Sequence, residues 1–252
     1  MLFWSYSCEF VFIRGLMVLV CAALYHEPMR YPRFYSVGLF ALLVAGAAGL
    51  LGQGSQPPLE NDQVRVIYAT DQPHKATSMH EHKLNRVMIY LTAGRQEITP
   101  QGGQKVVMDL KAGEVRWSPA SGMHVSEVTS AGPLKIVEVE IKKEGDPSKV
   151  VKTALDPLKV DPKDYTLEFE NSQVRVIRVK FPPHHAVPLH EHMLNRVVVY
   201  ITDQNGKMIT PDGKVDTAQH KAGEASWGGP TKHQEENVGD KPFEAVVVEL
   251  KS

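Results

Sequence analysis

The sequence contains two copies of one long unit, and this duplication limits the folds that the chain can adopt. The octet HEHKLNRV at residues 80–87 returns as HEHMLNRV at residues 190–197, which is 110 positions later. Three further pairs of segments keep the same order along the chain: ENDQVRVI and ENSQVRVI, ITPQG and ITPDG, and KAGE in both copies, each time with a Trp three residues later. A period this long indicates a duplicated domain and not a solenoid of short repeats.

Each copy is built from short segments that favour strands. Residues 64–67, 86–91 and 134–141 are rich in β-branched side chains and are bounded by Gly, Pro, Asn or Asp. The second copy repeats these segments, and no segment has a convincing helical period. Residues 100–103 and 211–213 combine Pro with Gly and predict hairpin turns. Many short strands separated by turns predict an all-β sandwich or small barrel.

The length of 252 residues suits a leader followed by two small domains. The segment at 144–162 contains three prolines among Lys and Asp residues, so it reads as a linker with one helical turn at 153–155. The predicted organisation is a leader at 1–56, a first domain at 57–143, this linker, and a second domain at 163–252.

The charge of the chain argues against one class of partner. The formal net charge is -1, and acidic and basic residues alternate along the predicted strands. Nucleic acid binding needs Lys and Arg clustered on one face, so no nucleic acid partner is expected. Both cysteines, Cys8 and Cys21, lie in the leader, which leaves the predicted domains without a disulfide or a thiol nucleophile.

The leader has the pattern of an export signal. Residues 37–51 are apolar and uncharged, Arg30 and Arg33 precede them, and small and polar residues follow at 52–57. This layout predicts cleavage and a periplasmic or secreted protein. Two alternatives stay open: an uncleaved anchor that tethers the protein to the inner membrane, which a second apolar stretch at 10–25 would favour, and a buried core helix, because about 15 apolar residues are short for a membrane span.

The His-x-His pairs predict metal sites. Residues i and i+2 of a strand share one face, so His80 and His82 can both point into a barrel while Glu81 points out. Imidazole is a good ligand for Fe, Mn, Zn, Cu or Ni at neutral pH, and a third ligand is needed to hold such an ion well. The candidate ligands are His80, His82 and His124 in the first copy and His190, His192 and His233 in the second.

These residues resemble the cupin superfamily, whose first motif combines a Gly, a His-x-His pair and a Glu, and whose second combines Gly, Pro-x-Gly, His and Asn. The resemblance covers roughly residues 58–143 and 165–252. It implies a bicupin of the conserved-barrel (cupin-2) type: two tandem small β-barrels of the double-stranded β-helix or jelly-roll class, with three His ligands in each. Asn237 fits the second motif, whereas the first copy has Val128 there. A small-molecule ligand and a homodimer are further expectations from the resemblance.

The sequence departs from the cupin pattern at the metal-binding Glu. Arg86 and Arg196 stand near that position, preceded by Asn85 and Asn195. A guanidinium stays protonated and cannot ligate a cation, so each site is expected to have three His ligands at most, with the Asn side chains as neutral fourth ligands. The four Asn and Arg residues are also the candidate substrate-binding residues.

The orientation of the two arginines decides their role. An inward side chain can bind a carboxylate or phosphate beside the metal. An outward side chain would pair with Glu81 or Glu191 and have no chemical role. Strand parity counted from His82 favours the inward orientation, but a bulge in between would reverse it.

Three functions are consistent with these patterns. The first is a metal-dependent enzyme, such as an oxygenase or isomerase, that acts on a small acidic metabolite. The second is a module that binds a small ligand or metal without turnover. The third is a structural protein whose histidines are only hydrogen-bonded in the barrel. The second copy, which retains Asn237, is the better candidate for activity.

Overall fold

The computed structural model describes residues 4–13, 16–25 and 59–252, and the chain divides into two units at residues 52 and 53. In the first unit, strands β1 (Trp4–Ile13) and β2 (Leu16–Tyr25) form an antiparallel hairpin. The predicted export signal at residues 37–51 lies outside the described residues and stays a prediction. Among the described residues, no helix has the length and apolar character that a membrane span requires.

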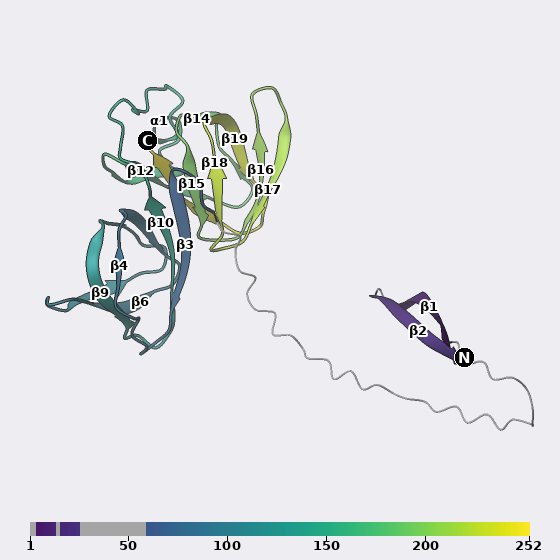
Figure 1. Ribbon diagram of the computed structural model, residues 1–252. Coiled ribbons are helices and arrows are strands. Elements are labelled where there is room, and N and C mark those ends of the chain that lie inside the picture. The colour runs from purple at the N-terminus through teal and green to yellow at the C-terminus, as the bar shows by residue number, and fades with distance from the viewer. Residues whose placement is uncertain (1–3, 14–15, 26–58) are drawn as a thin grey trace, which may run out of the picture. The chain divides into compact units, whose positions relative to one another are not determined.

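The second unit begins with a barrel of two four-stranded sheets (Figure 1). One sheet has the order β3-β10-β5-β8 and the other β4-β9-β6-β7, with antiparallel pairing between neighbours. The strands are β3 (Val64–Asp71), β4 (His80–His82), β5 (Arg86–Tyr90), β6 (Gly94–Pro100), β7 (Val106–Leu110), β8 (Val115–Ser118), β9 (Ser121–Val128) and β10 (Leu134–Ile141).

A second barrel repeats this arrangement and adds two strands, β11 and β13. Its sheets have the orders β11-β12-β20-β15-β18 and β13-β19-β16-β17, and β14 also pairs with β19. The elements are α1 (Pro157–Val160), β11 (Tyr165–Glu170), β12 (Val174–Phe181), β13 (His185–Ala186), β14 (His190–His192), β15 (Arg196–Tyr200), β16 (Gln204–Ile209), β17 (Val215–His220), β18 (Ala225–Gly228), β19 (Thr231–Asn237) and β20 (Phe243–Leu250). The all-β architecture of two tandem small barrels predicted from the sequence is confirmed.

The linker contains one helical turn, but not at the predicted position. The turn is α1, and the prediction had placed it at residues 153–155. Asp156 caps the turn by accepting a hydrogen bond from the backbone N–H of Leu158 at 3.2 Å. Pro157 follows at the first helical position, where its missing N–H costs nothing. The turn therefore begins after its capping Asp, as the Asp-Pro pair favours.

Strands β10 and β20 are buried on both faces. Their side chains alternate, so one face lines a barrel cavity and the other packs into an apolar core. In β10, Ile136 and Glu138 point into the first barrel, whereas Val137 and Val139 point away from it. In β20, Val247 points into the second barrel and its neighbours point away. The outward side chains of both strands belong to the same apolar core.

This core joins the two barrels. It contains buried side chains from β3, β5 and β10 of the first barrel and from β12, β15 and β20 of the second. Of its fourteen buried members, all but Leu250 are valine or isoleucine. β-branched side chains suit such a face because they pack well on a pleated surface. Two sheets packed face to face in this way bury the surfaces that a single barrel would leave exposed.

Four amide side chains cross between the barrels in a reciprocal pattern. The Nδ2 group of Asn195 donates to Oε1 of Gln63 at 2.6 Å, and Nδ2 of Asn85 donates to Oε1 of Gln173 at 2.6 Å. Because these residues are equivalent in the two copies, each barrel gives and receives the same contact. The amides therefore fix the position of one barrel against the other beside the apolar core.

We predict that replacing Asn195 with Ala destabilises the protein by about 1 kcal/mol, because Gln63 loses a partly buried hydrogen-bond partner. Asn85→Ala should cost at least as much, because Oδ1 of Asn85 also accepts from the backbone N–H of Ala120 at 2.8 Å. The double variant should lose about the sum, because the two contacts are separate. Urea unfolding measures this, with exposed Gln101→Ala as a control expected to change stability by less than about 0.5 kcal/mol. Equal stability of the control and Asn195→Ala would contradict this role.

Candidate metal site

The three predicted histidines of the first barrel come together. His80 and His82 lie on β4, and His124 lies on the neighbouring strand β9, where it is the register partner of His80. One ligand atom from each ring lies within 4.8 Å of the others. The three rings line a cavity of about 330 Å³ inside the barrel. Pairing β4 with β9 therefore brings residues more than 40 positions apart into one group.

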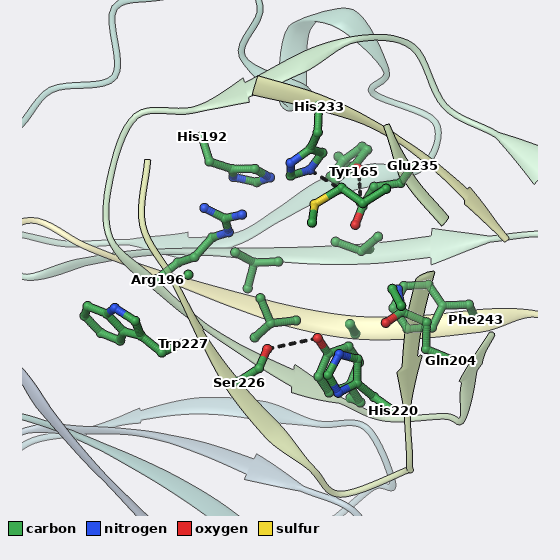
Figure 2. A pocket seen from close by; sticks show the side chains of 18 residues that line it. Tyr165, His192, Arg196, Gln204, His220, Ser226, Trp227, His233, Glu235 and Phe243 are labelled. Carbon is green, nitrogen blue, oxygen red and sulfur yellow. Dashed lines mark hydrogen bonds and ion pairs between the residues drawn. The ribbon is translucent and has the colours of Figure 1, made fainter. Parts of the chain in front are cut away.

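The second barrel assembles the equivalent triad with deeper burial. His190 and His192 lie on β14, and His233 on β19 faces His190 in the register. Their ligand atoms also lie within 4.8 Å of one another, and all three side chains are at most 3% exposed. His192 and His233 line a cavity of about 360 Å³ (Figure 2).

Hydrogen bonds at one ring nitrogen, Nδ1, orient most of these histidines. In three rings, Nδ1 lies 2.8 to 2.9 Å from a backbone carbonyl oxygen: His80 on Ser78, His124 on Gly122, and His190 on Pro188. A carbonyl oxygen can only accept, so Nδ1 carries the proton and Nε2 keeps its lone pair. A metal ligand requires this tautomer and this kind of support.

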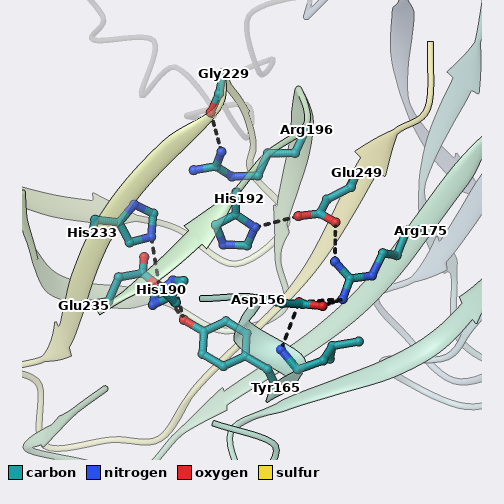
Figure 3. A network of polar contacts seen from close by, with 11 residues as sticks. Asp156, Tyr165, Arg175, His190, His192, Arg196, Gly229, His233, Glu235 and Glu249 are labelled. Carbon is teal, nitrogen blue, oxygen red and sulfur yellow. Dashed lines mark hydrogen bonds and ion pairs between the residues drawn. The ribbon is translucent and has the colours of Figure 1, made fainter. Parts of the chain in front are cut away.

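His192 is held by a carboxylate instead. Its Nδ1 lies 2.7 Å from Oε1 of Glu249, and the other oxygen of Glu249 accepts from Nη1 of Arg175 at 3.0 Å. Nη2 of Arg175 contacts both oxygens of Asp156, at 2.6 and 2.9 Å (Figure 3). This buried chain ties the triad to the start of α1. In the first barrel, Glu140 takes the place of Glu249 and pairs with Arg65, whose side chain is 47% exposed.

The electrostatics keep three of the imidazoles neutral. Burial lowers the pKa of His82 to about 4 and that of His233 to about 3, with the positive charge of Arg86 or Arg196 and the neighbouring rings adding to the effect. Burial, followed by Arg196 and His190, lowers the pKa of His192 well below its usual value. Neutral imidazole is the form that binds metal, so protons do not compete for these rings near pH 7.

His233 has a further property that fits a metal. Both of its ring nitrogens are buried and neither has a hydrogen-bond partner among the described residues. A buried polar atom without a partner costs about 1 to 3 kcal/mol unless something binds it. Because neutral, converging imidazole nitrogens are the usual ligands of divalent transition metals, the residues present in both triads fit such an ion.

The sequence analysis missed a carboxylate beside the second triad. Oε2 of Glu235 lies 3.9 Å from Nε2 of His233 and 4.0 Å from Nε2 of His190. The hydroxyl of Tyr165 donates to Oε2 of Glu235 at 3.0 Å and lies 3.1 Å from Nε2 of His190 (Figure 3). The first barrel has Ser126 at the equivalent position. The spacing of His233 and Glu235, two positions apart on one strand, could have indicated this carboxylate. Comparison of the two copies did not reveal it, because the first copy has no carboxylate there.

Both predicted arginines point into the cavities. Arg86 and Arg196 are 6% and 7% exposed and line the first and the second cavity. Nε of Arg86 lies 3.2 Å from Oε2 of Glu138, whereas Nη1 of Arg196 donates to the carbonyl oxygen of Gly229. The inward orientation that strand parity favours is thus the observed one, and ligand binding by these side chains stays a prediction.

The asparagines of the motifs have other contacts. Asn85 and Asn195 do not line the two barrel cavities, and their amides bind across the barrel interface as described above. They are therefore not placed as fourth ligands of either triad. Asn237 donates to the carbonyl oxygens of Pro182 and Lys241 and holds that loop, which is a structural role that Val128 cannot fill in the first copy.

A third group of ligand-type side chains lies outside both cavities. Asp161, Asp164 and His185 have ligand atoms within 4.8 Å of one another. Nε2 of His185 lies 2.6 Å from the buried carboxylate of Asp164, and repulsion from Asp164 contributes, after burial, to a raised pKa of Asp161. An ion pair with a neighbouring acid accounts for these contacts, so this group is not part of the candidate site.

Comparison with solved structures shows the fold. AerE from Microcystis aeruginosa matches with a TM-score of 0.54 at 13% identity, over 78% of this chain and 97% of its own. A variant of oxalate decarboxylase from Bacillus subtilis matches with a TM-score of 0.51 at 16% identity, over 77% and 75% of the two chains. Another structure of that enzyme, described by its Mn(II) centres, matches at 14% identity with a TM-score of 0.50, over 75% and 69%. No protein-family model and no curated protein sequence matches this chain.

We predict that Arg175→Met destabilises the protein by about 3 to 5 kcal/mol, because it leaves the carboxylates of Asp156 and Glu249 buried without a counter-charge. Arg65→Met is the matched control in the other copy. It should cost less, because Arg65 is half exposed and pairs with one carboxylate. Denaturant unfolding of both variants measures the difference, and equal losses would contradict a special role for the network around Glu249.

Proposed function

Because the chain has the fold of the cupin superfamily, with two cupin barrels in tandem, we propose that it is a metal-binding bicupin that holds one divalent transition metal ion at each His triad and binds a small acidic molecule beside one of them. Two features of the second triad carry the proposal: its rings are buried, with those of His192 and His233 neutral, and His233 has no partner for either nitrogen. The Mn(II) centres named for the oxalate decarboxylase add support for a divalent ion.

The identity of the ion follows from the ligands only as a class. Imidazole nitrogens suit Fe, Mn, Zn, Cu and Ni, and they disfavour Ca and Mg, which prefer oxygen ligands. Both triads offer three such nitrogens, so we propose one ion of this class in each barrel. Three protein ligands leave coordination positions open for water or for a ligand, as catalytic metal sites require.

The acidic ligand is proposed from Arg196, which lines the cavity beside the second triad. A guanidinium recognises a carboxylate with two parallel hydrogen bonds, and burial in a cavity strengthens this contact. A carboxylate bound there would also lie close to the positive charge of the ion. The cavities, of about 330 and 360 Å³, suit a small metabolite and not a polymer.

Tyr165 and Glu235 favour catalysis over simple binding in the second barrel. Burial, followed by the charge of Glu235, raises the pKa of Tyr165 well above its usual value. The hydroxyl therefore stays protonated and donates a hydrogen bond to the Glu235 carboxylate. Burial opposes ionisation of Glu235, but its pKa is lowered overall, and the hydrogen bond that it accepts from Tyr165 contributes to this. A bound ion would supply Lewis-acid chemistry, while Glu235 can accept a proton at Oε2 and Tyr165 can position Glu235.

The first barrel has Ser126 in place of Glu235. Binding without turnover is therefore the second candidate function, proposed for the first barrel.

Metal content tests the proposal. The full chain, purified without chelator or nickel resin, should contain about two equivalents of a transition metal by plasma mass spectrometry. His190→Ala/His192→Ala and His80→Ala/His82→Ala should each lower this to about one, because each removes two of three ligands. His74→Ala/His184→Ala, which lies outside both triads, is the control and should keep both equivalents. Absence of metal after reconstitution with Fe, Mn, Zn, Cu and Ni would overturn the proposal.

A further inference from the structure

The two cavities differ in the charge that faces their arginines. In the first barrel, the carboxylate of Glu138 lies 3.2 Å from Nε of Arg86, and both side chains are more than nine-tenths buried. The position of Glu138 on β10 corresponds to Val247 on β20. Among the described residues, Arg196 has no carboxylate within ion-pair distance. Arg86 thus has a carboxylate in direct contact, whereas Glu235 and Glu249 act on Arg196 only from beyond ion-pair distance.

A second position reinforces this difference. Arg196 pairs in the register with Gly228, and a Cβ atom at Gly228 would lie 3.1 Å from Cζ of Arg196. The glycine therefore lets the guanidinium lie against the strand, where Nη1 donates to the Gly229 carbonyl (Figure 3). Among the described residues, Nε and Nη2 of Arg196 make no hydrogen bond or ion pair. In the first barrel, Ser118 stands opposite Arg86, and the pairing of Nε with Glu138 leaves Nη1 of Arg86 buried without a hydrogen-bond partner.

The remaining charged groups of the two cavities follow the same division. Asp71 and Arg116 also line the first cavity, and Arg116 is bound to Glu114 at 2.6 Å. The position of Asp71 corresponds to Phe181 in the second barrel. An anion entering the first cavity would meet paired arginines and two carboxylates. In the second it would meet an arginine without a carboxylate partner, with Glu235 held by Tyr165 at the triad.

The walls of the second cavity indicate the rest of the ligand. Beside Arg196, the cavity is lined by Val179, Val247 and Phe243, and by further apolar side chains of the same strands. The apolar body of a ligand can pack on this wall while its carboxylate contacts the guanidinium of Arg196. The contact gives this buried guanidinium a counter-charge at ion-pair distance.

We propose that only the second barrel binds an acidic ligand, a small carboxylic acid with an apolar body, and that Glu138 occupies in the first barrel the place that the carboxylate of this ligand takes in the second. The inference rests on the acid-binding part of the proposed function. It makes Val247 and Glu138 the pair of residues that decides which barrel accepts the acid.

Calorimetric titration of the full chain with benzoate tests this, with benzamide as the uncharged probe of the same shape. One equivalent of benzoate should bind, and benzamide should bind about tenfold or more weakly, because it lacks the charge that Arg196 recognises. Arg196→Met should lower the benzoate affinity about tenfold or more. Val247→Glu, which copies Glu138 into the second barrel, should do the same. Arg86→Met/Glu138→Met removes both charges from the first barrel together and should leave the single equivalent in place.

Two controls keep the outcomes distinct. Circular dichroism shows whether Val247→Glu has folded, and Arg196→Met tests the same point without burying a new charge. Metal content, measured on the same samples, reports on the metal-binding function separately. Two equivalents of benzoate, loss of binding in Arg86→Met/Glu138→Met, equal affinity for benzamide, or no benzoate binding in a chain with its full metal content would each overturn the inference.

Discussion

The rest of the structure depends on strands that are buried on both faces. In β10 and β20, one face packs into the apolar core between the barrels and the other lines a cavity. A shift of one residue in the register would exchange these faces and place Glu138 or Glu249 in the shared core. The cost of burying a charge in that core fixes the register, and the register in turn fixes where each triad and each arginine lies.

The same alternation explains how two copies with one motif arrive at different sites. The backbone, the triads and the inward arginines are common to both barrels, because they follow from strand pairing. The carboxylates are not common. The first barrel has Glu138 opposite its arginine, and the second has Glu235 opposite its histidines. The carboxylate therefore lies on a different strand in each barrel. This changes which charged groups are free to bind a ligand, while the fold stays the same.

Much of this site follows from the sequence, for a physical reason. A His-x-His pair on a strand must share a face, so the triads and the inward position of Arg86 and Arg196 could be predicted from parity. Contacts between distant segments could not. Glu138 lies 52 positions from Arg86 and meets it only through the pairing of β5 with β10. Asn85 and Asn195 were predicted as ligands because they adjoin the motif, but their partners lie in the other barrel, which no local pattern reveals.

A crystal structure of the metal-loaded protein, with the ion identified by anomalous scattering, tests the central claim most directly. The account predicts one ion in each barrel, about 2.0 to 2.2 Å from Nε2 of the three triad histidines. It further predicts that Nδ1 of His192 remains on Glu249. An ion bound elsewhere, for example at Asp161, Asp164 and His185, with both triads empty, would contradict the account.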